Sequence, residues 1–210
     1  MMRHHVAGMV GVVAVCWGCA RTQIASMAAP DVAGHPYNHV PVVFPVTDLA
    51  NRQFVEDAFA VSNARYTPSY TVLFPGRQYT NAELGQAFAT RGIDGVLLIS
   101  LDQAGVTHAT GSTSTSAWCY SYSSTGACTQ ASALTNSYDL SKPWARFTTQ
   151  LYDVTTGKVM WIATSSTGGN AYANQHDVLT SMTKSTVERL NRDGIVPTVA
   201  CDNVAKRSRC

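Results

Sequence analysis

Gly95-Val96-Leu97-Leu98-Ile99-Ser100-Leu101 is the most apolar stretch of the sequence downstream of residue 19. An uninterrupted apolar run of this length predicts a central β-strand that is buried on both faces. A helix is expected before it, because Thr80-Asn81-Ala82-Glu83 has the pattern of a capping box and apolar residues follow at helical spacing. Arg91-Gly92 then ends that helix, since glycine readily adopts the left-handed conformation of a helix stop.

Two further strands and a helix are predicted upstream of this run. Residues 40–46 are rich in valine, but Pro41 and Pro45 limit them to a short or edge strand. Thr47 or Asp48 can then cap a helix that runs through about residue 62. Residues 66–74 alternate in the manner of a strand and end at a Pro-Gly turn. This order predicts three parallel strands joined by right-handed crossovers.

An antiparallel hairpin and a last helix are predicted downstream. Residues 144–152 and 158–164 alternate in the manner of strands, and residues 153–157 end in glycine and connect them. Asn174 and Asp177 are spaced to cap a helix, whose inner stripe consists of Leu179, Met182, Thr186 and Leu190. The predicted fold class is therefore α/β (α+β), with a mixed sheet of about five strands, the order β-α-β-α-β-β-β-α and helices packed on the sheet. It forms a single domain over residues 39–197.

Residues 103–138 contain no Asp, Glu, Lys or Arg and are rich in serine and threonine. Alternating aromatic residues in the middle of this segment predict a β-ribbon that leaves the sheet as an excursion and not as a separate domain. Aromatic rings on such a ribbon can stack on the sugars of peptidoglycan or dock a protein partner. Covering the sheet edge and stabilising a hairpin is the simpler interpretation. The candidate partner-binding residues are Trp118, Tyr120 and Tyr122.

The composition of the 210 residues excludes several classes of protein. Hydrophobic residues make up 45% and charged residues 13%, which is not the composition of a disordered chain. The net charge is only +2 at pH 7, so no overall basic field indicates a nucleic-acid partner. We therefore expect a folded, weakly charged domain that does not bind nucleic acid.

The amino-terminal end has the features of an export signal. Arg3 and two histidines are followed by an apolar run over residues 6–15, which is too short to span a bilayer. Gly18-Cys19 closes this run and resembles the lipobox of bacterial lipoproteins, in which the cysteine is lipidated and the chain is cut before it. Trp17 and Cys16 depart from that pattern, and Cys16 is the weaker acceptor because a valine precedes it. We therefore expect a signal peptide over residues 1–18 and a lipidated Cys19.

Cys16 and Cys19 also form a CxxC motif, so a redox role is the alternative to lipidation. A thioredoxin-like motif needs a strand before it and an amphipathic helix after it, whereas here an apolar run precedes it and a polar segment follows.

Residues 19–38 are rich in small residues and predict a flexible tether. In enterobacterial lipoproteins, an aspartate directly after the lipidated cysteine retains the protein in the inner membrane. This sequence has Ala20 at that position. This resemblance implies an anchor in the inner leaflet of the outer membrane, facing the periplasm, with the inner membrane as the alternative.

Four cysteines remain for disulfides in an oxidising compartment, and four thiols allow three pairings. Locality favours one bridge within the ribbon and one in the polar tail over residues 198–210, so the expected bridges are Cys119–Cys128 and Cys201–Cys210. The tail also carries three basic residues near its end, which are expected to be solvated. Contact of these residues with anionic lipid headgroups is the less favoured alternative.

Patterns for catalysis, metals and cofactors are absent from the sequence. His35 and His39 lie in a segment with proline and glycine, where no helix would align them as ligands. The sequence contains neither a GxSxG nucleophile elbow nor a phosphate-binding loop. We therefore expect no metal, no cofactor and no enzymatic activity.

Three aspartates lie at predicted strand ends and turns. Asp94 and Asp102 bracket the central strand, and Asp153 begins the hairpin turn, where capping is the default role of aspartate. Trp161 follows that turn by a few residues. A tight turn with the indole packed under the last helix is favoured over a binding site.

Three motifs carry a resemblance to a known group of proteins. They are Gly92-Ile93-Asp94-Gly95-Val96-Leu97-Leu98-Ile99, Leu151-Tyr152-Asp153-Val154-Thr155-Thr156-Gly157-Lys158-Val159-Met160-Trp161 and Leu190-Asn191-Arg192-Asp193-Gly194-Ile195. Over residues 40–196 the chain resembles bacterial envelope lipoproteins whose fold is similar to the amino-terminal domain of TolB and to lipoprotein activators of penicillin-binding proteins. The resemblance implies a non-enzymatic adaptor or assembly factor, anchored to the membrane and bound to an envelope protein. The alternatives are a peptidoglycan-binding module and an envelope hydrolase that uses serine or aspartate of residues 103–138.

Overall fold

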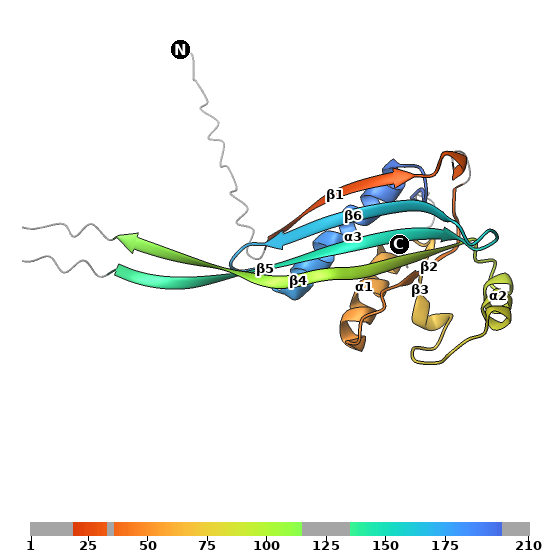
Figure 1. Ribbon diagram of the computed structural model, residues 1–210, viewed down its shortest axis with the longest axis horizontal. Coiled ribbons are helices and arrows are strands. Elements are labelled where there is room, and N and C mark those ends of the chain that lie inside the picture. The colour runs from red at the N-terminus through yellow and green to blue at the C-terminus, as the bar shows by residue number, and fades with distance from the viewer. Residues whose placement is uncertain (1–18, 33–35, 115–134, 199–210) are drawn as a thin grey trace, which may run out of the picture.

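The computed structural model describes residues 19–32, 36–114 and 135–198, which form a sheet with helices beside it (Figure 1). Six strands lie in the order β1-β6-β5-β4-β2-β3. The strands are β1 (Ala20–Ala28), β2 (Val40–Val43), β3 (Tyr66–Pro68), β4 (Gly95–Ser114), β5 (Thr135–Asp153) and β6 (Val159–Gly169). The helices are α1 (Leu49–Ser62), α2 (Asn81–Ala89) and α3 (Gln175–Arg192), with short 3-10 turns at Pro30–Val32 and Ser69–Thr71. The expected α/β class is confirmed, with six strands in place of about five.

The first half of the sheet is parallel, as the predicted order of elements requires. β2 pairs in parallel with both β3 and β4. α1 connects β2 to β3, and its N-cap is Asp48, whose carboxylate accepts the amides of Ala50 at 2.9 Å and Asn51 at 3.2 Å. The predicted capping box of Thr80 and Glu83 also forms, at the start of α2. The sequence signals for both helix starts are therefore confirmed.

The predicted strand over residues 66–74 is much shorter in the structure. β3 ends at Pro68, and the chain then bends through a 3-10 turn that begins at Ser69. The buried Glu56 carboxylate explains the bend, because it accepts hydrogen bonds from the Ser69 hydroxyl at 2.9 Å and from the Tyr70 amide at 3.3 Å. Both donors reach α1 only when the chain leaves the extended conformation.

β4, β5 and β6 are antiparallel, and the hairpin between β5 and β6 turns at Gly157, which has a φ of 68°. β6 pairs with β5 only as far as Trp144, whereas β4 and β5 pair on to Ser114 and Thr135. The two strands therefore continue past the sheet as a two-stranded ribbon, which projects from one end of the domain (Figure 1). The predicted excursion is confirmed for these strands, and residues 115–134 lie outside the described residues.

The prediction of a flexible tether over residues 19–38 is wrong for residues 20–28, which form β1. This strand pairs with β6 over its whole length, from Ala20 opposite Gly169 to Ala28 opposite Trp161. Its side chains alternate between half-buried and exposed near its start, which is typical of a strand with one face on the core. Apart from Ile24 its inward residues are small or polar, so the hydrophobic alternation is too weak to predict a strand.

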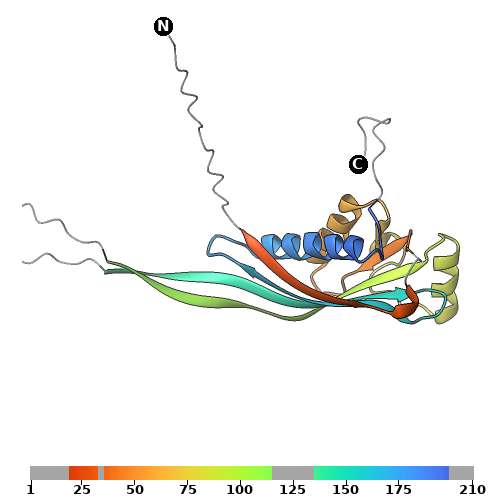
Figure 2. The same cartoon turned by 90° about the horizontal axis from the view of Figure 1, so that it is seen from above.

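α1 and α3 pack on the same face of the sheet, and α2 lies at the end opposite the ribbon (Figure 2). On the helix-covered face β4 buries Leu97 and Ile99 completely, whereas Val96 and Leu98 on the other face are half-buried. The prediction that this strand is buried on both faces is therefore wrong, because both large helices cover the same face. Among the residues described, no helix combines the length and the apolar character needed to cross a membrane.

The Asp193 carboxylate joins α3 to the two strands beneath it. Asp193 directly follows the helix and accepts hydrogen bonds from Nε1 of Trp161 on β6 at 2.8 Å and from the hydroxyl of Ser26 on β1 at 2.6 Å. Arg189 adds an ion pair, with its Nε 3.1 Å from Oδ1 of Asp193. Trp161 is 1% exposed, so the prediction that its indole packs under the last helix is confirmed.

Asp193→Asn is expected to lower the free energy of unfolding at neutral pH by about 1–3 kcal/mol, because the buried Trp161 indole and the half-buried Ser26 hydroxyl lose a charged acceptor. Burial acts to raise the pKa of Asp193, but the hydrogen bonds from Ser26 and Trp161 and the charge of Arg189 outweigh it and hold the pKa below its ordinary value of 3.8. The stabilisation is therefore fully present above the ordinary pKa and is lost as the pH falls through the folded-state pKa.

Denaturant unfolding of the wild type and the variant over the acid range measures this effect. The wild type should lose more stability than Asp193→Asn as the pH falls. Asp102→Asn is the control, because Asp102 is exposed and accepts a single hydroxyl, that of Thr148. Equal acid sensitivity of the wild type and Asp193→Asn would contradict the assigned role.

Candidate functional site: a groove at the root of the ribbon

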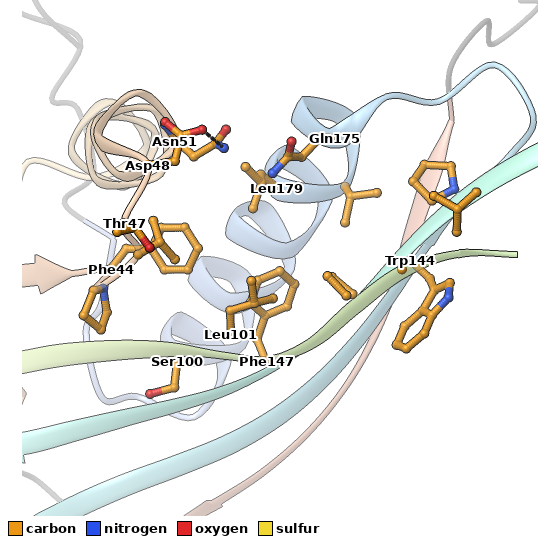
Figure 3. A pocket seen from close by; sticks show the side chains of 18 residues that line it. Phe44, Thr47, Asp48, Asn51, Ser100, Leu101, Trp144, Phe147, Gln175 and Leu179 are labelled. Carbon is orange, nitrogen blue, oxygen red and sulfur yellow. Dashed lines mark hydrogen bonds between the residues drawn. The ribbon is translucent and has the colours of Figure 1, made fainter.

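An apolar groove of about 840 Å³ lies where β4 and β5 leave the sheet as a ribbon (Figure 3). Its floor is formed by these two strands. One wall consists of residues 44–48, which connect β2 to α1, and of Asn51 in the first turn of α1, and the other wall is formed by the first turns of α3. We call it the ribbon-root groove. Its apolar lining includes Phe44, Leu101, Val106, Phe147, Val178 and Leu179.

The groove exists because β2 stops while β4 continues. β2 pairs with β4 only at Leu97 and Leu98, and Pro45 then leads the chain away from the sheet and into α1. The first turns of α1 and α3 stand on either side of the space that this leaves above β4 and β5 (Figure 3). The wall and the floor are tightly packed where they meet, since Phe44 of the wall and Phe147 of the floor are each 1% exposed and their ring centroids lie 6.4 Å apart.

A bulge in β4 directs additional apolar side chains into the groove. Asp102 is an extra residue between the pairs Leu101–Phe147 and Gln103–Arg146. Leu101 and Val106 are an odd number of residues apart, yet both line the groove because the bulge shifts the alternation of the strand. Their side chains are 42% and 51% exposed. The groove therefore presents apolar surface to solvent.

The one charged group in the lining of the groove is already engaged in hydrogen bonds. Among its lining residues Asp48 is the single ionisable one. Its carboxylate accepts the two backbone amides at the start of α1 and the side-chain amide of Asn51 at 2.7 Å, the last of which is drawn in Figure 3. A lining of this kind suits the burial of apolar groups, and it offers no convergent acid and base for catalysis.

Cys19, the predicted lipidation site, is exposed and directly precedes β1. Its carbonyl oxygen accepts a hydrogen bond from the amide of Asn170, in the turn between β6 and α3, at 3.0 Å. α3 also holds the start of β1, because the Ser181 hydroxyl donates to the Ala20 carbonyl at 3.2 Å and lies 2.9 Å from the Thr22 hydroxyl. Cys19 therefore lies at the end of the sheet from which the ribbon projects (Figure 1).

Most other predicted site residues lie outside the described residues. They are the aromatic residues of the ribbon and the cysteines expected to form disulfides, namely Trp118, Tyr120, Tyr122, Cys119, Cys128, Cys201 and Cys210. The partner-binding role of the ribbon and the two bridges therefore stay predictions. Of the two histidines considered as ligands, His35 is also outside the described residues, and His39 places Nδ1 3.1 Å from the carbonyl oxygen of Gly92.

Asp94 and Asp153 cap a strand end and a turn as predicted, whereas the prediction for Asp102 is wrong, because β4 continues past it and Asp102 lies at the bulge within the strand. Asp94, directly before β4, accepts the amides of Asn38 at 2.8 Å and His39 at 3.0 Å. Asp153 accepts the amide of Thr156 at 2.7 Å and its hydroxyl at 2.8 Å. Burial acts to raise the pKa of Asp153, but these hydrogen bonds outweigh it and hold the pKa below its ordinary value. Neither aspartate lines the ribbon-root groove.

The sequence did not predict the groove. Leu101 falls at the end of the predicted central strand, and Val106 falls in the charge-free segment that follows. Pro45, ahead of the Asp48 cap, is the signal that could have located the groove. It marks the point where the chain leaves β2 and enters α1, whereas β4 continues.

No known protein family matches the sequence, and no curated protein matches it. Solved structures match distantly. A PelC dodecamer from Paraburkholderia phytofirmans is 13% identical, with a TM-score of 0.47 over 81% of this chain and 98% of that chain. Lipoprotein GNA1162 from Neisseria meningitidis is 16% identical, with a TM-score of 0.38 over 73% of this chain and 98% of that chain. TolB from Acinetobacter baumannii is 16% identical, with a TM-score of 0.33 over 81% of this chain and 30% of that chain.

Phe147→Ala is expected to lower the free energy of unfolding by about 3–5 kcal/mol, because it removes a buried ring from the groove floor. Leu101→Ala is the matched control. It removes an apolar side chain from the same groove, but one that is 42% exposed, so a loss below about 1 kcal/mol is expected. Denaturant unfolding of both variants measures the difference. Equal losses would mean that Leu101 belongs to the core and that the groove is closed.

Proposed function

We propose that this protein is a non-enzymatic lipoprotein of the bacterial cell envelope, anchored through Cys19, that acts as an adaptor or assembly factor facing the periplasm. The observation that carries the proposal is the position of Cys19, which directly precedes β1. A cut before Cys19 removes residues 1–18 and leaves this strand complete. The cut that the lipobox-like pattern predicts therefore falls directly before β1 and does not interrupt it.

The anchor is proposed to lie in the inner leaflet of the outer membrane. Ala20 follows the cysteine, at the position where an aspartate retains enterobacterial lipoproteins in the inner membrane. A cysteine that carries a diacylglycerol and an amide-linked chain has enough acyl chains for stable attachment, whereas a single chain binds only marginally. The domain would then face the periplasm.

The ribbon-root groove is proposed to bind an envelope protein partner. Leu101 and Val106 supply exposed apolar surface, and Asp48 is engaged as a helix cap. Apolar surface of this kind gains free energy when a partner removes it from water. Hydrolysis would need an activated nucleophile or a convergent acid–base pair, which the lining of this groove does not supply.

Cys19→Ser is expected to abolish metabolic acyl labelling and to release the protein from the membrane fraction or leave it uncleaved, because a serine lacks the thiol that accepts the diacylglycerol. Cys16→Ser is the matched control, three residues upstream in the same motif, and it should keep both the label and the membrane location. Label that persists in Cys19→Ser but disappears in Cys16→Ser would move the acceptor to Cys16 and overturn the proposed anchor.

A photoreactive amino acid at position 106 is expected to crosslink to an envelope protein in living cells, because Val106 lies in the groove. The same probe at position 61 is the control, since Val61 is 81% exposed but does not line the groove. Leu101→Asp should abolish the adduct at position 106 by placing a charge in the apolar lining. Equal adducts at both positions, or labelling of the protein by a serine-hydrolase probe, would contradict an adaptor that binds through the groove.

A further inference from the structure

We propose that the turn over residues 170–173, between β6 and α3, lies on the lipid bilayer with the side chain of Tyr172 in the headgroup region. This inference rests on the proposed lipidation of Cys19. We call this segment the anchor turn. It contacts Cys19 directly, because the amide of Asn170 donates to the Cys19 carbonyl at 3.0 Å.

The fold leaves no spacer between the anchor and the domain. β1 begins at Ala20 and is paired with β6 from that residue onward, opposite Gly169. A flexible tether over residues 19–38 would average roughly 25 Å from end to end and would hold the domain away from the membrane. In the structure the residue next to the proposed lipid is already part of the sheet. The end of the sheet that contains Cys19 must therefore lie against the bilayer.

Tyr172 is within reach of the same bilayer surface. Its Cα lies at most about 13 Å from that of Cys19, since paired chains are about 5 Å apart and two residues span at most about 7.6 Å. The turn is fixed in shape, because Asn170 accepts the Tyr172 amide on its side chain at 3.0 Å and the Ala173 amide on its carbonyl at 3.1 Å. The position of the tyrosine relative to the anchor is therefore set by the fold.

The side chain of Tyr172 fits the headgroup region by its chemistry. It is 79% exposed, so its ring adds little to the packing of the domain. Tyrosine is enriched at membrane interfaces because its ring is apolar and its hydroxyl remains hydrated. The headgroup region of each leaflet is about 5–8 Å thick, which is enough to accommodate the ring.

The sequence of the ribbon is compatible with this orientation. The ribbon leaves the sheet at the same end as Cys19 (Figure 1), so a domain held against the bilayer also brings the ribbon near lipid. Residues 103–138 contain no Asp, Glu, Lys or Arg. Asp139 and Lys142 of β5 follow this segment toward the sheet, so the charge-free part of the ribbon is the part farther from the domain, and it can approach the bilayer without a charged side chain losing its hydration.

The test uses the full-length, lipidated protein in vesicles of phosphatidylethanolamine and phosphatidylglycerol. An environment-sensitive fluorescent amino acid replaces either Tyr172 or Met27, and lipids brominated near the headgroup serve as quenchers. Met27 is the matched control, because it is 73% exposed but lies about 27 Å from Cys19 along the same strand. We expect quenching and a blue shift of the emission at position 172, and neither change at position 27.

The outcomes separate this inference from the proposed anchor. Acylated protein with no quenching at position 172, or with equal quenching at positions 172 and 27, would overturn the contact of the anchor turn while the anchor itself stands. Wild-type protein that carries no acyl group on Cys19 would overturn both. Quenching confined to position 172 in protein acylated at Cys19 would support both.

Discussion

The buried carboxylate of Glu56 is the interaction on which the first half of the sheet depends. It is 0% exposed and accepts hydrogen bonds from the Phe44 amide at 3.1 Å, the Ser69 hydroxyl at 2.9 Å, the Tyr70 amide at 3.3 Å and Nε of Arg52 at 2.9 Å. A buried charge without such partners would be strongly destabilising, so the chain must bring these donors together. β2 therefore ends beside α1, β3 is cut short, and the wall of the ribbon-root groove is held in place.

Elements whose start, face and stop are encoded by neighbouring residues could be predicted from the sequence. α3 is the clearest case, because Asn174 and Asp177 form the predicted capping box and Leu179, Met182 and Leu190 are buried along one stripe as expected. The hairpin before β6 is another, since Gly157 adopts the positive φ that its turn requires. In these segments local propensity and tertiary packing favour the same conformation, so the local pattern is sufficient.

Features that depend on residues distant in the sequence could not be predicted. β1 packs through small and polar side chains, such as Thr22, whose hydroxyl lies 2.8 Å from that of Thr167 on β6. Such a strand becomes recognisable only when its partner strand is known. β3 is shortened by a carboxylate on α1, and the groove combines the segment after β2 with β4, β5, α1 and α3. Cys19 could be predicted as a lipidation site because its motif is local, whereas its contact with Asn170 required the fold.

The groove also follows an edge of β4, and this favours one type of partner. Beyond Leu98, β5 is the only described strand that pairs with β4, so the edge on the β2 side presents backbone amide and carbonyl groups. Leu101, Ala104 and Val106 line the groove along this edge. An extended segment of a partner can pair with such an edge and place alternate side chains in the apolar groove. The proposed partner would then occupy, further along β4, the place that β2 holds within the sheet.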